Sequence, residues 1–180
     1  MVRISAAVVG ALCALVFVTA SATHAQPAGF TRGPLITEYG PVVTVETAAP
    51  IPADAIFKVA FDITERGEMG SINRRLETAA RFLNMHAAAG VGADRMNLAI
   101  VVHGAAVNDL THNAAYGGEN ANAGLVEALQ AHGVAVYVCG QSAASRNVAA
   151  DDLLPGVEMA VSAMTAHALL QQKSYTLNPF

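Results

Sequence analysis

Two side chains with reactive chemistry stand at the ends of apolar segments in this 180-residue chain. His103 ends the segment 96–103 (M-N-L-A-I-V-V-H), and Cys139 ends the segment 134–139 (V-A-V-Y-V-C). Short apolar runs rich in β-branched residues are typical of buried strands. Functional groups gather beyond the carboxyl ends of parallel strands. We therefore expect the imidazole and the thiol to lie at the same sheet edge, provided that the two strands are neighbours.

The sequence around Cys139 favours an ionised thiol. A helix beginning near Ala143 would place its positive end close to Cys139, and Arg146 would add positive charge. Both effects stabilise the thiolate, which is the form that attacks sulfane sulfur and disulfides. His103 would pair with this thiolate or transfer a proton near neutral pH. The alternative is structural, because free cysteine is among the most buried residue types and a histidine at a strand end can bond the backbone.

The other histidines and the glycines form no recognised site motif. The histidines have neither i, i+4 spacing nor a neighbouring C-x-x-C, so we expect no metal and no cofactor. A copper or zinc site composed of Cys139 and His103 stays open as an alternative. The first strand is not followed by G-x-G-x-x-G, and the chain has no G-x-S-x-G, which disfavours dinucleotide binding and α/β-hydrolase chemistry. The histidines considered were His86, His112, His132 and His167.

Apolar strands that alternate with amphipathic helices determine the expected fold. This pattern is typical of a mainly parallel sheet covered by helices on both faces. We predict an α/β protein, a Rossmann-like three-layer α/β/α sandwich with about five strands. Besides the two strands above, strands are expected at 56–63, 157–161 and 175–180. Helices are expected from Ser71 to about Ala89, from Asn120 or Asn122 to Gly133, over 143–154 and over 163–172.

The beginning of the chain has the pattern of a secretory signal. Arg3 precedes an apolar run over 6–18, which small residues follow up to Ala25. This run is shorter than a transmembrane helix requires, so we predict cleavage after Ala25, a periplasmic location and no stable membrane span afterwards. A retained membrane anchor is the alternative. We divide the chain into a signal at 1–25, an extended N-terminal arm at 26–55 with a short edge strand near 42–45, and an α/β domain at 56–180.

Composition excludes several classes of protein. Of the residues, 53% are hydrophobic and 13% are charged, which excludes a disordered chain. The chain has ten basic and fourteen acidic residues, a net charge of −4, no tryptophan and 6% aromatic residues. Nucleic-acid binding rests on phosphate contacts from clustered basic residues and on aromatic stacking, so we expect no nucleic-acid partner.

Several segments together resemble a known family. The segment 134–147 (V-A-V-Y-V-C-G-Q-S-A-A-S-R-N) resembles the reactive-cysteine segment of the DsrE/DsrF-like family, the sulfur-relay proteins. The remainder of the chain is similar to the exported branch of that family. The segments that carry this similarity are K-V-A-F-D-I-T at Lys58, R-F-L-N-M-H-A-A-A-G-V at Arg81, V-V-H-G-A-A at Val101, D-L-L-P-G-V-E-M-A-V-S-A-M-T-A at Asp152 and Y-T-L-N-P-F at Tyr175.

The resemblance implies a small α/β subunit that forms a homo-trimer or homo-hexamer. It also implies that Cys139 carries sulfur as a persulfide, received from one thiol or persulfide donor and passed to an acceptor, with His103 and Arg146 in support. Relatives often have Arg-Gly where this chain has Arg146-Asn147, and asparagine tolerates the left-handed conformation that glycine provides. We therefore predict an exported sulfur carrier or sulfurtransferase. The alternatives are a non-enzymatic binding or scaffolding subunit with a structural Cys139, and a thiol-dependent metal or redox sensor.

Overall fold

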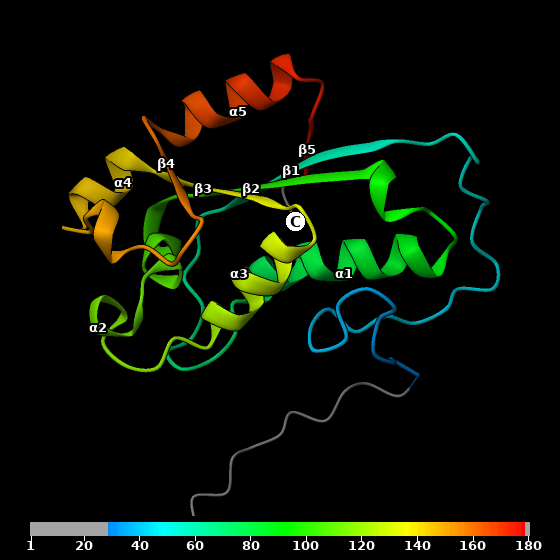
Figure 1. Cartoon of the computed structure of the whole chain (residues 1–180), viewed down its shortest axis with the longest axis horizontal. Helices are drawn as coiled ribbons and strands as arrows, with labels where there is room; N and C mark the ends of the chain where they lie inside the picture. The colour runs from blue at the N-terminus through cyan, green and yellow to red at the C-terminus, as the bar shows by residue number, and fades with distance from the viewer. Residues whose placement is uncertain (1–28, 179–180) are drawn as a thin grey trace, which may run out of the picture.

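A five-stranded, all-parallel sheet forms the centre of the computed structural model, which describes residues 29–178 (Figure 1). The order of the strands across the sheet is β4-β3-β2-β1-β5. The predicted α/β fold with a sheet of about five strands is confirmed. The strands are β1 (Phe57–Ile63), β2 (Met96–Val102), β3 (Ala135–Cys139), β4 (Glu158–Ala160) and β5 (Thr176–Asn178).

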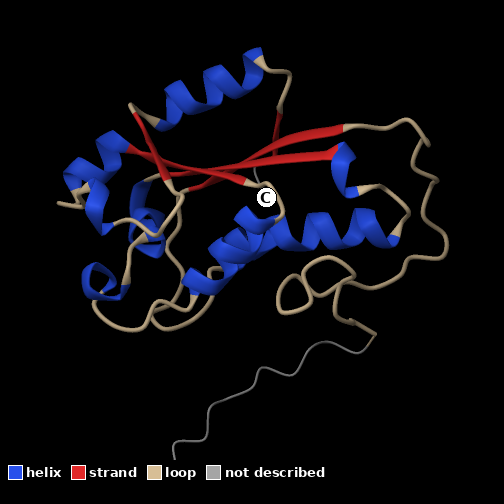
Figure 2. Ribbon diagram, in the orientation of Figure 1, coloured by secondary structure: helices blue, strands red, loops and turns tan. Residues whose placement is uncertain are grey.

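Helices cover the two faces of the sheet unequally (Figure 2). Helices α1 (Arg74–Ala88) and α3 (Asn122–Ala131) lie on one face, over a large core that includes Phe61 and Ile100. Helix α5 (Ala163–Gln172) covers the other face, where the buried cluster is smaller and consists mostly of small side chains. Because side chains alternate between the two faces of a strand, the residues next to Phe61 belong to this thinner layer.

Helix α1 starts later than the sequence pattern predicts. Its N-cap is Asn73 rather than Ser71, and the Asn73 side chain accepts the Arg75 N–H at 2.9 Å. Serine and asparagine cap helices equally well, so capping preference alone does not choose between them. Tertiary contacts favour Asn73, because its own N–H donates to Asn122 Oδ1 at 2.7 Å and its amide donates to Asp109 Oδ2 at 2.7 Å.

The helix predicted over 143–154 is wrong in its bounds. Helix α4 (Gly140–Ser145) begins immediately after Cys139 and ends early, and a 3₁₀ turn, η3 (Ala150–Asp152), follows. Asn147 has a φ of 55°, so the chain leaves the helical conformation at the position where relatives often have glycine. The prediction that Asn147 tolerates a left-handed conformation is confirmed.

One buried amide makes most of the hydrogen bonds between the domain and the segment that precedes β1. Asn84 of α1 is fully buried, and its Oδ1 accepts the N–H groups of Leu35 and Ile36. Its Nδ2 donates to the carbonyls of Ile36, Tyr39 and Gly40 at 2.9–3.0 Å. The short strand expected near 42–45 is reduced to a single antiparallel bridge between Thr31 and Val42.

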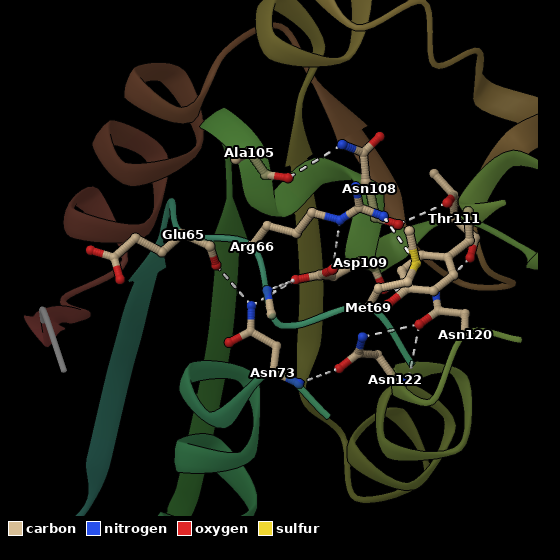
Figure 3. A network of polar contacts seen from close by, with 12 residues as sticks. Glu65, Arg66, Met69, Asn73, Ala105, Asn108, Asp109, Thr111, Asn120 and Asn122 are labelled. Atoms are coloured by element: carbon tan, nitrogen blue, oxygen red, sulfur yellow. Dashed lines mark hydrogen bonds and ion pairs between the residues drawn. The ribbon is translucent and has the colours of Figure 1, made fainter. Parts of the chain in front are cut away.

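A second polar network holds the loop between β1 and α1 against the 3₁₀ turn η2 (Gly104–Leu110) (Figure 3). At its centre is the fully buried Asp109, whose Oδ2 accepts from the Gly67 N–H and from Asn73. Arg66 lies 3.6 Å from the other carboxylate oxygen and over the Tyr116 ring. Burial raises the pKa of Asp109, although these partners act in the opposite direction. The network fixes the backbone that leaves β1 and β2 at their carboxyl ends.

Within residues 29–178, the structure has no helix that is both long enough and apolar enough to span a membrane. The predicted signal segment and its cleavage position lie outside the described residues.

Candidate functional site

The carboxyl ends of three adjacent strands converge on one cavity. Asp62 lies near the end of β1, His103 directly follows β2, and Cys139 ends β3. All three side chains lie on the sheet face that α5 covers, because Asp62 alternates with Phe61 and the other two continue the same face of their own strands. The cavity has a volume of about 450 Å³. Its lining residues are Asp62, His103, Cys139, Gln141, Ser162, Ala163, Met164, His167 and Leu177.

Hydrogen-bond donors surround the sulfur of Cys139. Burial raises the pKa of the Cys139 thiol, but the hydroxyl of Ser142 and the N–H groups of Ser142, Ala163 and Gln141 outweigh it, so the pKa is lowered. The Cys139 side chain makes no capping hydrogen bond with α4. The pKa is lowered because donors that face the sulfur stabilise the negatively charged thiolate more than the neutral thiol. Cys139 is 5% exposed, and its contact with open space is through the cavity.

Gly104 links the ends of β2 and β3. Its N–H donates to Ser142 Oγ at 3.1 Å, which leaves the hydroxyl proton of Ser142 free to point at Cys139. Gly104 has a φ of +56°, and a Cβ atom there would lie 2.5 Å from Thr64 Oγ1. Glycine is therefore required both by the backbone conformation and by the close approach of Thr64. In this way the turn after His103 helps to position the donor that serves Cys139.

Asp62 binds two histidines from distant parts of the chain. Its Oδ1 lies 3.1 Å from His103 Nε2 and 2.7 Å from His167 Nε2. Burial raises the pKa of Asp62, but the hydrogen bonds from His167 and His103 outweigh it, so the pKa is lowered and the carboxylate stays ionised. Because a carboxylate only accepts hydrogen bonds, both rings must carry a proton on Nε2.

Arg146 does not line the cavity. It ends α4, and its Nε donates to the Gly104 carbonyl at 2.6 Å. Its contact is therefore with the backbone beside His103, and a role of its charge in the chemistry of Cys139 stays a prediction. Cys139 and His103, by contrast, both face the cavity.

The described residues, 29–178, contain no group of three or more histidine, cysteine, aspartate or glutamate side chains with the geometry to hold a metal ion. His86 and His132 lie outside the cavity, and their Nδ1 atoms are within 2.8–2.9 Å of helix carbonyls four residues earlier.

Sequence reasoning missed three groups of this site. Asp62 carried a signal, because it is a charged residue near the end of an otherwise apolar strand. His167 was considered only as a metal ligand, and Ser142 carried no signal at all. His167 and Asp62 are 105 residues apart, so their contact depends on where α5 lies.

The fold and the cavity together define a class of protein, namely a small parallel α/β domain with a free cysteine at the carboxyl edge of its sheet. Within residues 29–178 this cysteine is Cys139. Residues 58–179 match the model of the DsrE/DsrF-like family, and the chain belongs to this family, which is of the sulfur-relay type. The resemblance of the sequence to this family is thereby confirmed. Membership of the exported branch stays a prediction.

Two solved structures have a similar fold. One is a protein of unknown function, MTH1491 from Methanobacterium thermoautotrophicum, with a TM-score of 0.55, 22% identity, and coverage of 69% of this chain and 99% of the other. The second is the ychN protein from E. coli, with a TM-score of 0.52, 19% identity, and coverage of 69% and 100%. At these identities the similarity supports the fold alone. None of the curated proteins gives a significant match.

Proposed function

We propose that the protein carries sulfane sulfur as a persulfide on Cys139. The observation that supports this most directly is the position of the thiol, which faces the cavity and is surrounded by donors that lower its pKa. Thiolate is the form that attacks sulfane sulfur, so these donors prepare the residue for the reaction. Membership of a family of the sulfur-relay type agrees with this chemistry.

The reaction needs no redox cofactor. The Cys139 thiolate attacks the outer sulfur of a donor persulfide, R–S–SH, and a new S–S bond forms as the S–S bond of the donor breaks. The electron pair of the broken bond leaves with the donor sulfur as R–S⁻, which takes up a proton. Cys139 then holds the outer sulfur as –S–SH. Attack by an acceptor thiolate on this sulfur regenerates the Cys139 thiolate, so no net oxidation or reduction is required.

A second candidate function is a non-enzymatic binding subunit in which Cys139 is structural. The low exposure of Cys139 favours this candidate, as do its contacts with a buried cluster that includes Ala60, Ala99 and Val101. The two functions differ in the reactivity of the folded protein. A carrier thiol is alkylated in the native state, whereas a structural thiol reacts only after unfolding.

The decisive experiment exposes the full chain to polysulfide and measures its intact mass. We expect a gain of one sulfur that Cys139→Ala abolishes. Cys13→Ala is the matched control, because it removes the other cysteine of the sequence and should retain the gain. An equal gain in wild type and Cys139→Ala would refute the carrier function, as would no gain in either.

We further propose that the protein is exported to the periplasm and acts there as a homo-trimer or homo-hexamer. The N-terminal signal pattern supports export. Exposed apolar side chains beside the cavity support assembly: Val161 is 72% exposed and Met164 is 80% exposed. N-terminal sequencing of protein from the periplasmic fraction tests cleavage, and light scattering after size exclusion tests the number of subunits. A full-length product in the cytoplasm would contradict export, and a monomer would contradict assembly.

A further inference from the structure

Sulfur transfer to Cys139 creates a proton requirement that the thiol and its donors do not meet. When the S–S bond of the donor breaks, its inner sulfur departs as a thiolate. An alkyl thiolate is a poor leaving group unless it is protonated, because exchange slows as the pKa of the leaving thiol rises. A group that holds a proton near the leaving sulfur would accelerate this step.

Helix α5 brings such a group to the cavity. The Ala163 N–H at the start of this helix faces the Cys139 sulfur, and His167 lies four residues later. Residues at i and i+4 lie on the same helix face, with Cβ atoms roughly 5–6 Å apart. The side chains of Ala163 and His167 therefore both line the cavity, where the Ala163 N–H faces the nucleophilic sulfur and His167 contributes an imidazole.

The tautomer of His167 leaves one nitrogen available. Its Nε2–H donates to Asp62 Oδ1 at 2.7 Å, and among the described residues its Nδ1 has no hydrogen-bond partner. His103 donates to the same oxygen from 3.1 Å and has the more exposed side chain, at 32% compared with 16% for His167. The shorter contact and deeper burial hold His167 in one orientation. His103 completes the hydrogen bonding of the carboxylate.

The charged groups that face this imidazole are few. Besides His167, the titratable residues that line the cavity are Asp62, His103 and Cys139, from β1, the end of β2 and β3. Arg146 lies outside the cavity, on the Gly104 carbonyl. Because the remaining lining residues are uncharged, the negative groups in the cavity are Asp62, which His167 contacts directly, and the Cys139 thiolate.

We propose that His167, oriented by Asp62, is the proton donor to the leaving thiolate when Cys139 accepts sulfur, and the base that deprotonates the incoming thiol when Cys139 releases it. The role in sulfur transfer rests on the proposed carrier function. In the loading step, Cys139–S⁻, R–S–SH and protonated His167 become Cys139–S–SH, R–SH and neutral His167. The release step restores the proton to His167 and the negative charge to Cys139, so the cycle balances in atoms, charge and electrons.

The test separates proton donation from thiolate formation by varying the leaving group. Cys139 reacts either with bis(hydroxyethyl) disulfide, which releases a basic alkyl thiolate, or with dipyridyl disulfide, which releases an acidic thiol that departs without help. For His167→Gln we expect a loss on the order of a hundredfold with the alkyl disulfide. We expect an unchanged rate with dipyridyl disulfide. Added imidazole should restore part of the alkyl disulfide rate.

Two further variants distinguish a loss of proton donation from a general effect of substitution on the folded protein. Asp62→Asn leaves His167 in place and keeps an oxygen that can accept its Nε2–H, but removes the negative charge beside the imidazole, and should change the pH profile of the alkyl disulfide reaction. His132→Gln changes an exposed histidine outside the cavity and should match wild type with both reagents. Equal slowing of His167→Gln with both reagents would overturn the proposal, as would no slowing with either.

Neither reagent is a persulfide, so this experiment and the polysulfide experiment can fail separately. A wild-type protein that takes up no sulfur, but shows the expected dependence on the leaving group, would refute the carrier function and leave the proton donor in place. Uptake of sulfur by the wild type, together with no effect of His167→Gln on either disulfide, would support the carrier function and refute the proton donor.

Discussion

Removal of the Ser142 hydroxyl should make Cys139 a weaker acid and a slower nucleophile. This hydroxyl is one of the donors that lower the pKa of Cys139. A hydrogen bond to a charged group contributes about 1.5–3 kcal/mol. We take about 1.5 kcal/mol for Ser142→Ala, because the N–H groups of Ser142, Ala163 and Gln141 remain. Near neutral pH this corresponds to roughly tenfold less thiolate.

The expected loss of rate is smaller than the loss of thiolate. A more basic thiolate is intrinsically more nucleophilic, with a Brønsted coefficient of about 0.4–0.5. Each thiolate of the variant therefore reacts about threefold faster, which offsets part of the loss. Alkylation of Ser142→Ala by iodoacetamide should therefore be about three- to fourfold slower than in wild type at neutral pH. At a pH where both thiols are ionised, the variant should react faster than wild type. The assay is the alkylation rate as a function of pH, followed by intact mass.

Two control variants make this prediction strict. Ser145→Ala removes a hydroxyl from the same helix, but Ser145 Oγ donates to the Ser142 carbonyl at 2.9 Å, so its removal should leave the profile unchanged. Ser142→Thr keeps the hydroxyl and should restore the wild-type rate. Identical profiles for Ser142→Ala and wild type would refute the assignment of this donor. If the wild-type thiol reacted only in denaturant, Cys139 would not be accessible in the folded protein and the reasoning would fail.

Three further predictions concern the elements that hold the site. The lowered pKa of Asp62 means that its ionised form stabilises the folded state above the pKa of the unfolded carboxyl, and that this contribution is lost as pH falls through the lower folded-state pKa. Urea unfolding should therefore show the difference between wild type and Asp62→Asn shrinking on acidification, and a constant difference would contradict this. Gly104→Ala should cost at least about 1–2 kcal/mol, because its φ is positive and Thr64 occupies the space for a Cβ. Gly118→Ala is the control in thermal unfolding, because a Cβ added there would have no atom within 4 Å. Equal melting temperatures for Gly104→Ala and Gly118→Ala would argue against the constraint at Gly104. Asn84→Ala removes five hydrogen-bond contacts to the N-terminal segment and should cost about 3 kcal/mol and speed proteolysis there, whereas wild-type resistance would show that other contacts hold the segment.

Much of the fold follows from local pattern. The predicted strand at 56–63 is observed at Phe57–Ile63, and the helix predicted over 163–172 is observed with the same bounds. Hydrophobic period and capping residues are local properties, so they locate elements well. The errors occur where local signals compete. Ser71 and Asn73 are both good caps, and contacts with α3 and η2 decide between them.

The sequence by itself indicated that β2 and β3 are buried parallel strands, and hence that His103 and Cys139 lie at the same edge of the sheet if the two strands are neighbours; the structure shows that they are. That inference needs only hydrophobic pattern and the geometry of parallel strands. Only the tertiary structure decided which groups act on them. Asp62 and His167 meet because α5 packs across the sheet, and the Arg146 guanidinium binds the Gly104 carbonyl instead of lining the cavity. Such contacts depend on the packing of elements far apart in the chain, and no local pattern of residues encodes that packing.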